Sequence, residues 1–357
     1  MLDMDQYDMP QLAEEVFDEL RAALRPVLIF GAGCPPEEAR EFMLRMRIPV
    51  LVTWGARDGI PEAIGSFGTH GVKAANLAVQ NADYILCIGS RLDTKSTGAP
   101  ASDFAPRAKL VMVDIDQHEL LKMAKIGRPL YRAILSDARE FLRHLLRASP
   151  LAEINTQTEW WEQIREWKRE HPPGPGRPYE IMAELSKLLR PDDVVVSDTG
   201  CVVAWAMQAL EMPLGCRFIH AWNMTPMGYG LPAAIGAAFA TGKRVILLTG
   251  DGGLSVNITE MATLAKHKLP VKILLFNNRG HAMCRQTQRV WLDGAYHGTG
   301  DSDLATPNFL AIARAYGITD CLNMPAALFV EGPTFIEFEI EPDQGVSPQV
   351  KFGEQLA

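Results

Sequence analysis

The chain has 357 residues, of which 47% are apolar and 22% charged, and its formal net charge is −8. This length allows two domains, and the composition is ordinary for a globular protein. The acidic balance argues against nucleic acid as a partner, because it leaves no basic surface for phosphate groups.

Cysteine usage and apolar runs bear on the compartment. The six cysteines are scattered and form no CxxC pair, which favours reduced thiols over a disulfide framework or a zinc site. The opening residues, MLDMDQYDMP, are acidic and lack the core of a signal peptide. The longest apolar runs are far shorter than a membrane span. We therefore expect a cytoplasmic protein that does not associate with membranes.

The first half of the chain alternates short apolar runs with helical segments. After an amphipathic helix, expected over about residues 10–24, apolar runs occur at 27–30, 50–53, 84–88 and 110–113. This alternation predicts an α/β fold with a doubly wound parallel sheet over about residues 25–147. The turn Gly31-Ala32-Gly33 is a weak nucleotide signal, because the third glycine of the dinucleotide pattern is missing. An NAD-dependent enzyme is disfavoured for the same reason.

A linker is expected over residues 148–178. Its helix carries Trp160, Trp161 and Trp167, which we interpret as packing or partner surface rather than as part of a cofactor site. It ends in HPPGPGRP, which cannot continue a helix. Strands and helices alternate again over residues 179–357, which predicts a second doubly wound sheet. The expected divisions are therefore 1–24, 25–147, 148–178 and 179–357.

The most informative stretch is residues 245–278, VILLTGDGGLSVNITEMATLAKHKLPVKILLFNN. One apolar run ends at a glycine turn that contains Asp251, a helix is expected over about residues 254–267, and a second run ends at Asn278. In a right-handed βαβ unit both turns lie at the same edge of the sheet, so these two side chains become neighbours. Their oxygens suit Mg²⁺ or Ca²⁺. The adjoining glycines let backbone N–H groups approach closely at a helix N-terminus, which favours a bound diphosphate.

This motif pair resembles the thiamin diphosphate (ThDP) fingerprint of acetolactate-synthase-like enzymes. The resemblance implies that Asp251, Asn278 and the main-chain carbonyl of Gly280 bind Mg²⁺. The segment MGYGLPAAIG at 227–236 matches the same family, in which a large apolar residue, here Met227, lies under the bend of ThDP. The bend matters because the 4′-imino nitrogen must reach the thiazolium C2 proton, and a polarisable Met can support it. Further positions expected at the cofactor are Gly200, Gly250, Gly252, Gly253, Leu254 and Met283.

The first domain resembles the central domain of the same family. Segments 25–28 (RPVL), 68–71 (GTHG), 89–93 (GSRLD) and 114–116 (DID) match it in order. In many relatives this domain holds FAD without a redox role, and in others it is empty. Both alternatives stay open, and an empty scaffold is favoured over FAD. Positions that match the flavin site are Gly31, Gly33, His70, Arg91, Asp93, Asp114 and Asp116, and the Arg91 guanidinium suits a diphosphate.

Three segments depart from the family pattern. Residues 200–202 read GCV where relatives often have Gly-Gln-His, so side-chain contacts to the diphosphate are lost. Residues 223–226 read NMTP in place of a glycine-rich segment, and Thr287 stands where true acetolactate synthases often have tryptophan. These changes alter the wall around the thiazolium. Asn223, Arg285 and Gln286 are candidate substrate contacts, although Arg285 is equally well explained as a solvated helical cation.

The family's pyrimidine-binding domain supplies a glutamate that hydrogen-bonds the aminopyrimidine, and we find no match to it in the sequence. We therefore expect the diphosphate-binding subunit of a split enzyme, with a separate subunit that provides the glutamate in a dimer of heterodimers. The resemblance implies decarboxylation of a 2-oxoacid, followed by ligation of the enamine to a second carbonyl. A ThDP-dependent C–C hydrolase, a simple 2-oxoacid decarboxylase and a non-catalytic binding or regulatory subunit remain open.

Overall fold

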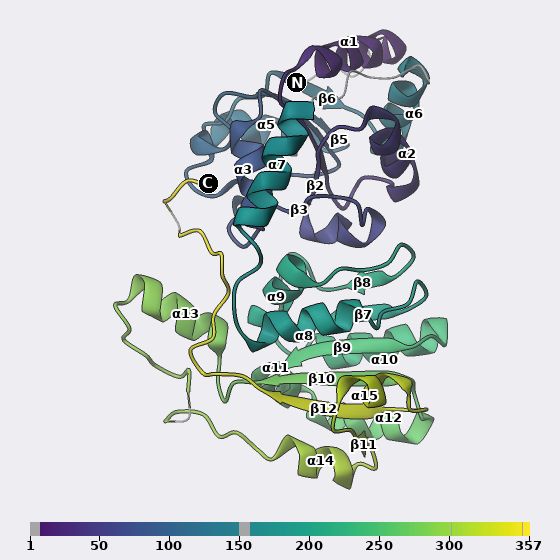
Figure 1. Cartoon of the computed structure of the whole chain (residues 1–357), viewed down its shortest axis with the longest axis vertical. Helices are drawn as coiled ribbons and strands as arrows, with labels where there is room; N and C mark the ends of the chain where they lie inside the picture. Colours follow the sequence, from purple (N-terminus) through teal and green to yellow (C-terminus); the bar gives the residue numbers. More distant parts are fainter. Residues whose placement is uncertain (1–7, 150–157, 301, 352) are drawn as a thin grey trace. The chain divides into compact units, whose positions relative to one another are not determined.

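A computed structural model describes residues 8–149, 158–300, 302–351 and 353–357. The chain divides into two compact units, labelled along the chain in Figure 1. The first unit extends to Pro173 and also contains Pro348–Ala357, and the second is Gly174–Ser347. Each unit is built on its own parallel sheet, so the expected fold class is confirmed.

The sheet of the first unit has six strands in the order β3-β2-β1-β4-β5-β6, and every neighbouring pair is parallel. The strand order reverses between β1 and β4, where the turns that follow these two strands meet. The strands are β1 (Pro26–Phe30), β2 (Val50–Val52), β3 (Gly65–Ser66), β4 (Tyr84–Ile88), β5 (Lys109–Asp114) and β6 (Arg132–Leu135).

Helices cover the first sheet in two separate core clusters. One cluster contains the apolar faces of α1 (Met9–Ala22), α2 (Pro36–Met46) and α6 (Ala138–Ala148). The other contains those of α3 (Lys73–Asn81), α5 (Gln117–Lys125) and α7 (Thr158–Glu170). Three short elements lie between strands. The element η2 (Trp54–Gly59) lies between β2 and β3, and α4 (Thr94–Thr97) and η3 (Ala101–Asp103) lie between β4 and β5.

The division differs from the expected boundaries at α7 and at the end of the chain. We expect α7 to be part of a linker, yet its Trp160 is buried in the first core, in edge-to-face contact with Trp167. The packing role proposed for the tryptophans is thus confirmed for this pair. We expect the last ten residues in the second domain, but Val350 donates to Thr69 O at 2.9 Å and Leu356 is buried in the first unit. Long-range apolar burial decides both placements.

The second sheet also has six parallel strands, in the order β11-β12-β10-β9-β7-β8. Strands β9 and β10 pair with Gly250 opposite Phe276, so their ends lie at one edge of the sheet, as expected. The strands are β7 (Val194–Ser197), β8 (Arg217–Ile219), β9 (Val245–Gly250), β10 (Val271–Asn277), β11 (Thr319–Asp320) and β12 (Thr334–Glu339).

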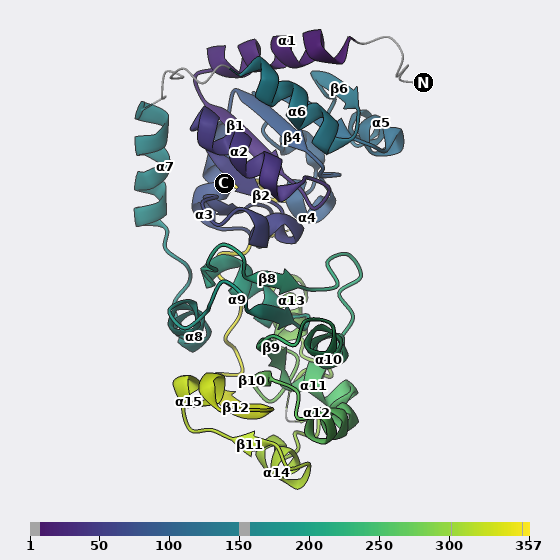
Figure 2. The same cartoon turned by 90° about the vertical axis from the view of Figure 1, so that its right-hand side faces the viewer.

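The helix expected over about residues 254–267 is divided into three pieces. It starts earlier, at Asp251, and Asn257 interrupts it by donating its side-chain amide to Gly228 O at 2.8 Å. Figure 2 shows α10, α11 and α12 beside one another, and they share a core cluster with α14. The helices are α8 (Arg177–Ser186), α9 (Cys201–Ala209), α10 (Gly230–Thr241), α11 (Asp251–Val256), η4 (Ile258–Glu260), α12 (Met261–His267), α13 (Ala282–Trp291), α14 (Phe309–Ala315) and α15 (Met324–Phe329).

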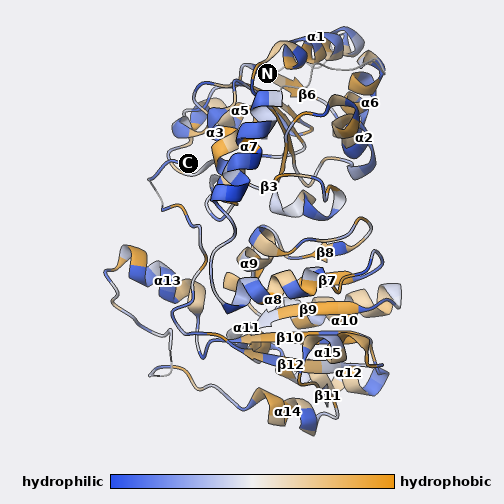
Figure 3. Cartoon of the chain, in the orientation of Figure 1, coloured by the Kyte–Doolittle hydropathy of each residue, from blue (hydrophilic) through white to orange (hydrophobic). Residues whose placement is uncertain are grey.

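Hydropathy follows burial in both units. Strands such as β9 and β10 are apolar along most of their length, while polar residues gather on exposed helix faces (Figure 3). Within the described ranges, no helix combines the length and the apolar character that crossing a membrane requires.

Candidate active site

Three residues with oxygen atoms that could bind a metal ion, Asp251, Asn278 and Gly280, converge at the edge of the second sheet, just beyond β9 and β10. Asp251 is 5% exposed, and its Oδ2 accepts the Gly280 N–H at 2.7 Å. In the orientation that the structure shows, the amide oxygen of Asn278 faces two acceptors, Asp251 Oδ1 at 3.1 Å and Gly280 O at 3.0 Å. Rotating the amide by half a turn would place its nitrogen there as a donor. A carboxylate, an amide and a main-chain carbonyl are donors that Mg²⁺ takes, so the residues fit this ion.

Burial makes this carboxylate costly without a cation. Desolvation raises the pKa of Asp251, while N–H groups of Gly280 and Gly252 and the nearby His281 oppose the rise. A divalent ion would remove the cost by pairing with the charge. Metal binding by these residues stays a prediction.

The glycine turn that begins α11 has no room for side chains. A methyl group at Gly252 would lie 2.5 Å from Cε1 of His281 and 3.0 Å from Cε of Met227. At Gly253 it would lie 2.8 Å from Cγ of Asp198. The sequence suggested that these glycines serve backbone approach to a ligand, and the structure adds that three neighbouring side chains press against them.

A cavity of about 190 Å³ opens over this turn. It is lined by the segment after β7, by Trp205 and Phe276, by the glycine turn and by the start of α13. It brings together most of the positions expected at the cofactor, namely Gly200, Met227, Gly250, Asp251, Gly252, Gly253, Asn278, Gly280 and Met283. Leu254 does not line it, because its side chain is 1% exposed and belongs to the core.

A second cavity, of about 340 Å³, lies against the first. The two share Met227, Asp251, Gly252, Gly280 and His281 as a common wall. Ser255, Val256 and a segment that includes residues 304–307 complete the second cavity. Met227 is 41% exposed and borders both spaces, which agrees with a side chain that supports a ligand.

Sequence reasoning missed two residues of this site. His281 stands in the common wall, and its position directly after the proposed metal carbonyl was the available signal. Asp198 follows β7 and packs against Gly253 without being among the expected site residues, although an acidic residue followed by Gly200 at this edge of a parallel sheet was a signal.

None of the three candidate substrate residues is among the residues that line these two cavities. Asn223 is exposed in the loop before Met227. Arg285 pairs with Asp343 at 2.6 Å, with its guanidinium 4.1 Å from the centre of a tyrosine ring. Gln286 is buried, and its amide donates to Val346 O at 2.9 Å and accepts the Val346 N–H at 2.7 Å. Their role in substrate binding stays a prediction.

The glycines after β1 in the first unit serve close packing between two turns. Gly31 donates to Ile88 O at 3.0 Å, and Gly33 donates to Gly89 O at 2.9 Å. A methyl group on Gly31 would lie 2.2 Å from Gly89 O. These two N–H groups, which a diphosphate would need at this crossing, are therefore already used.

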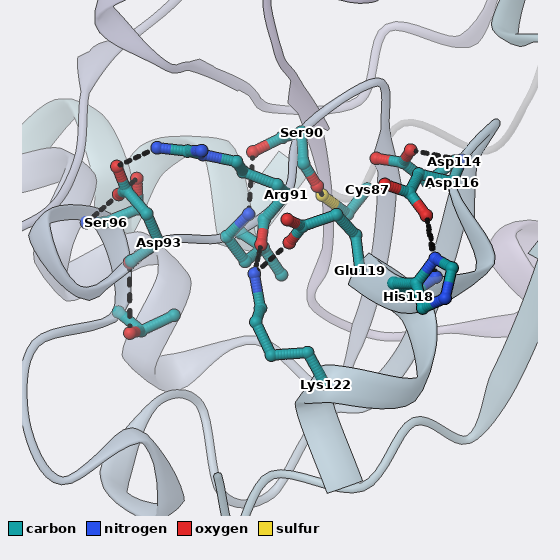
Figure 4. A network of polar contacts seen from close by, with 12 residues as sticks. Cys87, Ser90, Arg91, Asp93, Ser96, Asp114, Asp116, His118, Glu119 and Lys122 are labelled. Carbon is teal, nitrogen blue, oxygen red and sulfur yellow. Dashed lines mark hydrogen bonds and ion pairs between the residues drawn. The ribbon is translucent and has the colours of Figure 1, made fainter. Parts of the chain in front are cut away.

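The other candidate flavin residues bond mainly to neighbouring groups (Figure 4). Arg91 lies 3.7 Å from Asp93, which caps α4 through the Ser96 N–H at 3.0 Å. Asp114 accepts the Asp116 N–H at 2.9 Å, and burial raises the pKa of Asp114. The observed contacts do not form a diphosphate cradle, and the choice between FAD and an empty scaffold, which the sequence favours, stays a prediction.

His70, the remaining candidate, contacts the end of the chain rather than this network. Its Nε2 lies 3.1 Å from the side-chain nitrogen of Gln349. Burial lowers the pKa of His70 to about 4. The ring is therefore neutral at pH 7 and accepts this hydrogen bond.

Comparison with known proteins adds two family matches. Residues 13–145 match the family model described as the thiamine pyrophosphate enzyme central domain. Residues 198–333 match the one described as its C-terminal TPP binding domain. Both matches lie within the two sheet-bearing units.

Curated relatives of similar sequence are acetolactate synthase subunits. The chain is 32% identical to acetolactate synthase isozyme 1 large subunit of Escherichia coli (strain K12), over 94% of this chain and 62% of that protein. It is also 32% identical to the probable acetolactate synthase large subunit of Methanocaldococcus jannaschii, over 93% of this chain and 60% of that protein. The chain thus spans about three fifths of the length of these relatives.

Proposed function

We propose, on the basis that this chain belongs to the thiamine pyrophosphate enzyme family and carries its central and C-terminal domains, that the second unit anchors the diphosphate of ThDP with Mg²⁺. The observation that carries the proposal is the convergence of Asp251, Asn278 and Gly280 beside a cavity that Met227 borders. Hard oxygen donors next to close-packed glycines suit a metal-bound diphosphate.

The chain's own residues would divide the work of holding the cofactor. Asp251, Asn278 and the Gly280 carbonyl would hold Mg²⁺, the Gly252 and Gly253 turn would admit the diphosphate, and Met227 would support the rings. ThDP, when bound, supplies an electron sink for cleavage next to a carbonyl. The apolar walls from Trp205, Phe276 and Met283 would limit access of water.

The proton chemistry at the aminopyrimidine needs an acid that these walls lack. Among the described residues that line the two cavities, Asp251 is the sole carboxylate, and it already accepts from Gly280. We therefore propose that a partner subunit brings the glutamate, in a hetero-oligomer. The assembled enzyme would decarboxylate a 2-oxoacid and join the product to a second carbonyl, by analogy with the acetolactate synthase relatives.

A second candidate is a subunit that binds the cofactor without turnover. The cavity wall at Cys201 and Val202 offers weak polar contacts or none to a diphosphate, which would reduce the grip on the cofactor. Under this alternative the chain would bind ThDP and Mg²⁺ but would support no reaction with any partner.

Calorimetry and a turnover assay test these proposals in sequence. The full chain is titrated with ThDP in the presence of Mg²⁺ and of EDTA, and binding is expected only with the metal. Absence of metal-dependent binding would contradict the proposed function. Consumption of pyruvate is then measured for the chain alone and after co-expression with a pyrimidine-binding-domain protein. Turnover only in the second case supports the split enzyme, turnover by the chain alone contradicts it, and binding without turnover favours the second candidate.

A further inference from the structure

A buried carboxylate just beyond β7 ties together three parts of the site. Asp198 is 1% exposed, and its Oδ1 accepts the N–H groups of Thr199 at 2.8 Å and Gly228 at 3.1 Å. Its Oδ2 accepts the Gly230 N–H at 2.8 Å. Gly230 is the first residue of α10, so the carboxylate caps this helix from 32 positions earlier in the chain.

The same residue is fixed from its other sides. Its own N–H donates to Leu248 O at 2.8 Å, which holds it to the neighbouring strand β9. Its carboxyl carbon would lie 2.8 Å from a methyl group on Gly253, so the carboxylate packs directly against the glycine turn of α11. Asp198 is therefore held by the sheet and in turn holds the loop that carries Met227.

The loop around Met227 needs such an anchor. Thr225 has a φ of 43° and Gly228 a φ of 84°, so the chain adopts left-handed conformations on both sides of the methionine. A β-branched residue with positive φ is strained and persists only where surrounding contacts impose it. Two of the N–H groups that follow Met227 are bonded to Asp198, whereas the methionine itself is 41% exposed.

We infer that Asp198 is a positioning residue, which sets the place of Met227 over the glycine turn and thereby the affinity for the ring portion of ThDP. The inference rests on the proposed function, because it takes ThDP as the ligand of the cavity. A merely structural cap would stabilise the second unit without distinguishing the rings of the cofactor from its diphosphate. Asp198→Asn keeps the side-chain carbon that packs against Gly253 but disturbs the bonds to the loop of Met227, so it should matter for ligands that reach Met227 and not for those that stop at the metal.

The test compares two ligands on the full chain by calorimetry with Mg²⁺. Asp198→Asn keeps the shape of the side chain but turns one acceptor into a donor that faces an N–H group. We expect affinity for ThDP to fall about tenfold, as the loss of one hydrogen bond would produce, and affinity for inorganic pyrophosphate to stay within about twofold. In the background of Met227→Ala, the Asp198→Asn change should add little further loss, because coupled residues are not additive.

Asp193→Asn is the matched control. Asp193 is also 1% exposed and lies just before β7, at the opposite end of the same strand, where it accepts from Arg244 Nε at 2.7 Å. This control should lower stability without changing either affinity. Equal losses for both ligands in Asp198→Asn, or losses fully additive with Met227→Ala, would overturn the inference.

Amide hydrogen exchange covers the remaining outcomes. If wild-type chain binds neither ligand, the proposed function fails, but the anchoring of the loop can still be measured. The N–H groups of Gly228 and Gly230 should exchange slowly without cofactor, and rapid exchange at both would overturn the inference. The same measurement on wild-type chain decides the question if Asp198→Asn does not fold.

Discussion

Replacing Asp251 with asparagine separates the effect of the candidate metal site on the stability of the cofactor-free chain from its effect on ligand binding. Burial raises the pKa of this carboxyl group in the absence of a metal, so the ionised form is unfavourable there. The amide loses a charge-assisted bond from Gly280, worth about 1 kcal/mol more than a neutral one, but it also removes the desolvation cost of a buried charge, which is on the order of several kcal/mol even after relaxation. We expect the cofactor-free variant to be as stable as wild type or more stable, by up to about 1 kcal/mol.

The sign of the pH dependence follows from the raised pKa. The folded chain takes up a proton at Asp251 at a higher pH than the unfolded chain does, so this group costs stability above its folded pKa. The cost disappears as the pH falls below that value. Any advantage of Asp251→Asn should therefore shrink on acidification.

The ligand response should move in the opposite direction. A ligand at 100 times its Kd stabilises the folded state by about 2.7 kcal/mol, equivalent to roughly 5–10 °C for a unit of this size. Loss of the anionic metal ligand should weaken binding by on the order of 100-fold or more, and the stabilisation by the same ligand concentration should fall to about 0.4 kcal/mol or less. Thermal unfolding is followed with and without Mg²⁺ and ThDP. The control is Asp320→Asn, because Asp320 on β11 forms an ion pair with Arg314 at 2.7 Å and lines neither cavity. A full ligand shift in Asp251→Asn would refute the metal assignment.

Three further predictions concern stability. A methyl group at Gly230 would lie 2.9 Å from a carboxylate oxygen, whereas Gly236 on the same helix has no heavy atom within 4 Å. In urea unfolding, the free energy of unfolding should fall by about 1–3 kcal/mol in G230A and rise by about 0.4–1 kcal/mol in G236A. Equal effects of the two substitutions would contradict the packing described at Gly230. Burial lowers the pKa of His70 from 6.5 to about 4. As the pH falls, this imidazole is therefore protonated in the unfolded chain before it is in the folded chain, and stability should be lost between these two pH values. Amide exchange in residues 348–357 should then rise in wild type more than in His70→Gln, which retains an acceptor for Gln349; an equal rise in both would count against this contact. Leu356→Ala should cost the first unit about 2–4 kcal/mol, because this side chain is 1% exposed; a loss below about 1 kcal/mol in urea unfolding would show that the segment is not held by this contact.

Local signals explain why much of the fold could be predicted. Each strand of the second sheet that bears the site is a short apolar run that ends in a polar or glycine turn, as at Gly250 and Asn278. Alternation of such runs with helices permits few arrangements other than a parallel sheet. A parallel sheet in turn brings the ends of β9 and β10 together, so the meeting of Asp251 and Asn278 followed from the sequence.

The sequence by itself thus determined the two α/β sheets and the pair of motifs at one edge, because these depend on patterns within a few tens of residues. Only the tertiary structure decided that Asp198 caps α10, that His281 stands between two cavities, and that Gln286 bonds to Val346. It also decided that α7 and Leu356 belong to the first core. These outcomes depend on contacts between residues distant in the chain, where burial and hydrogen-bond geometry select a partner that no local pattern specifies.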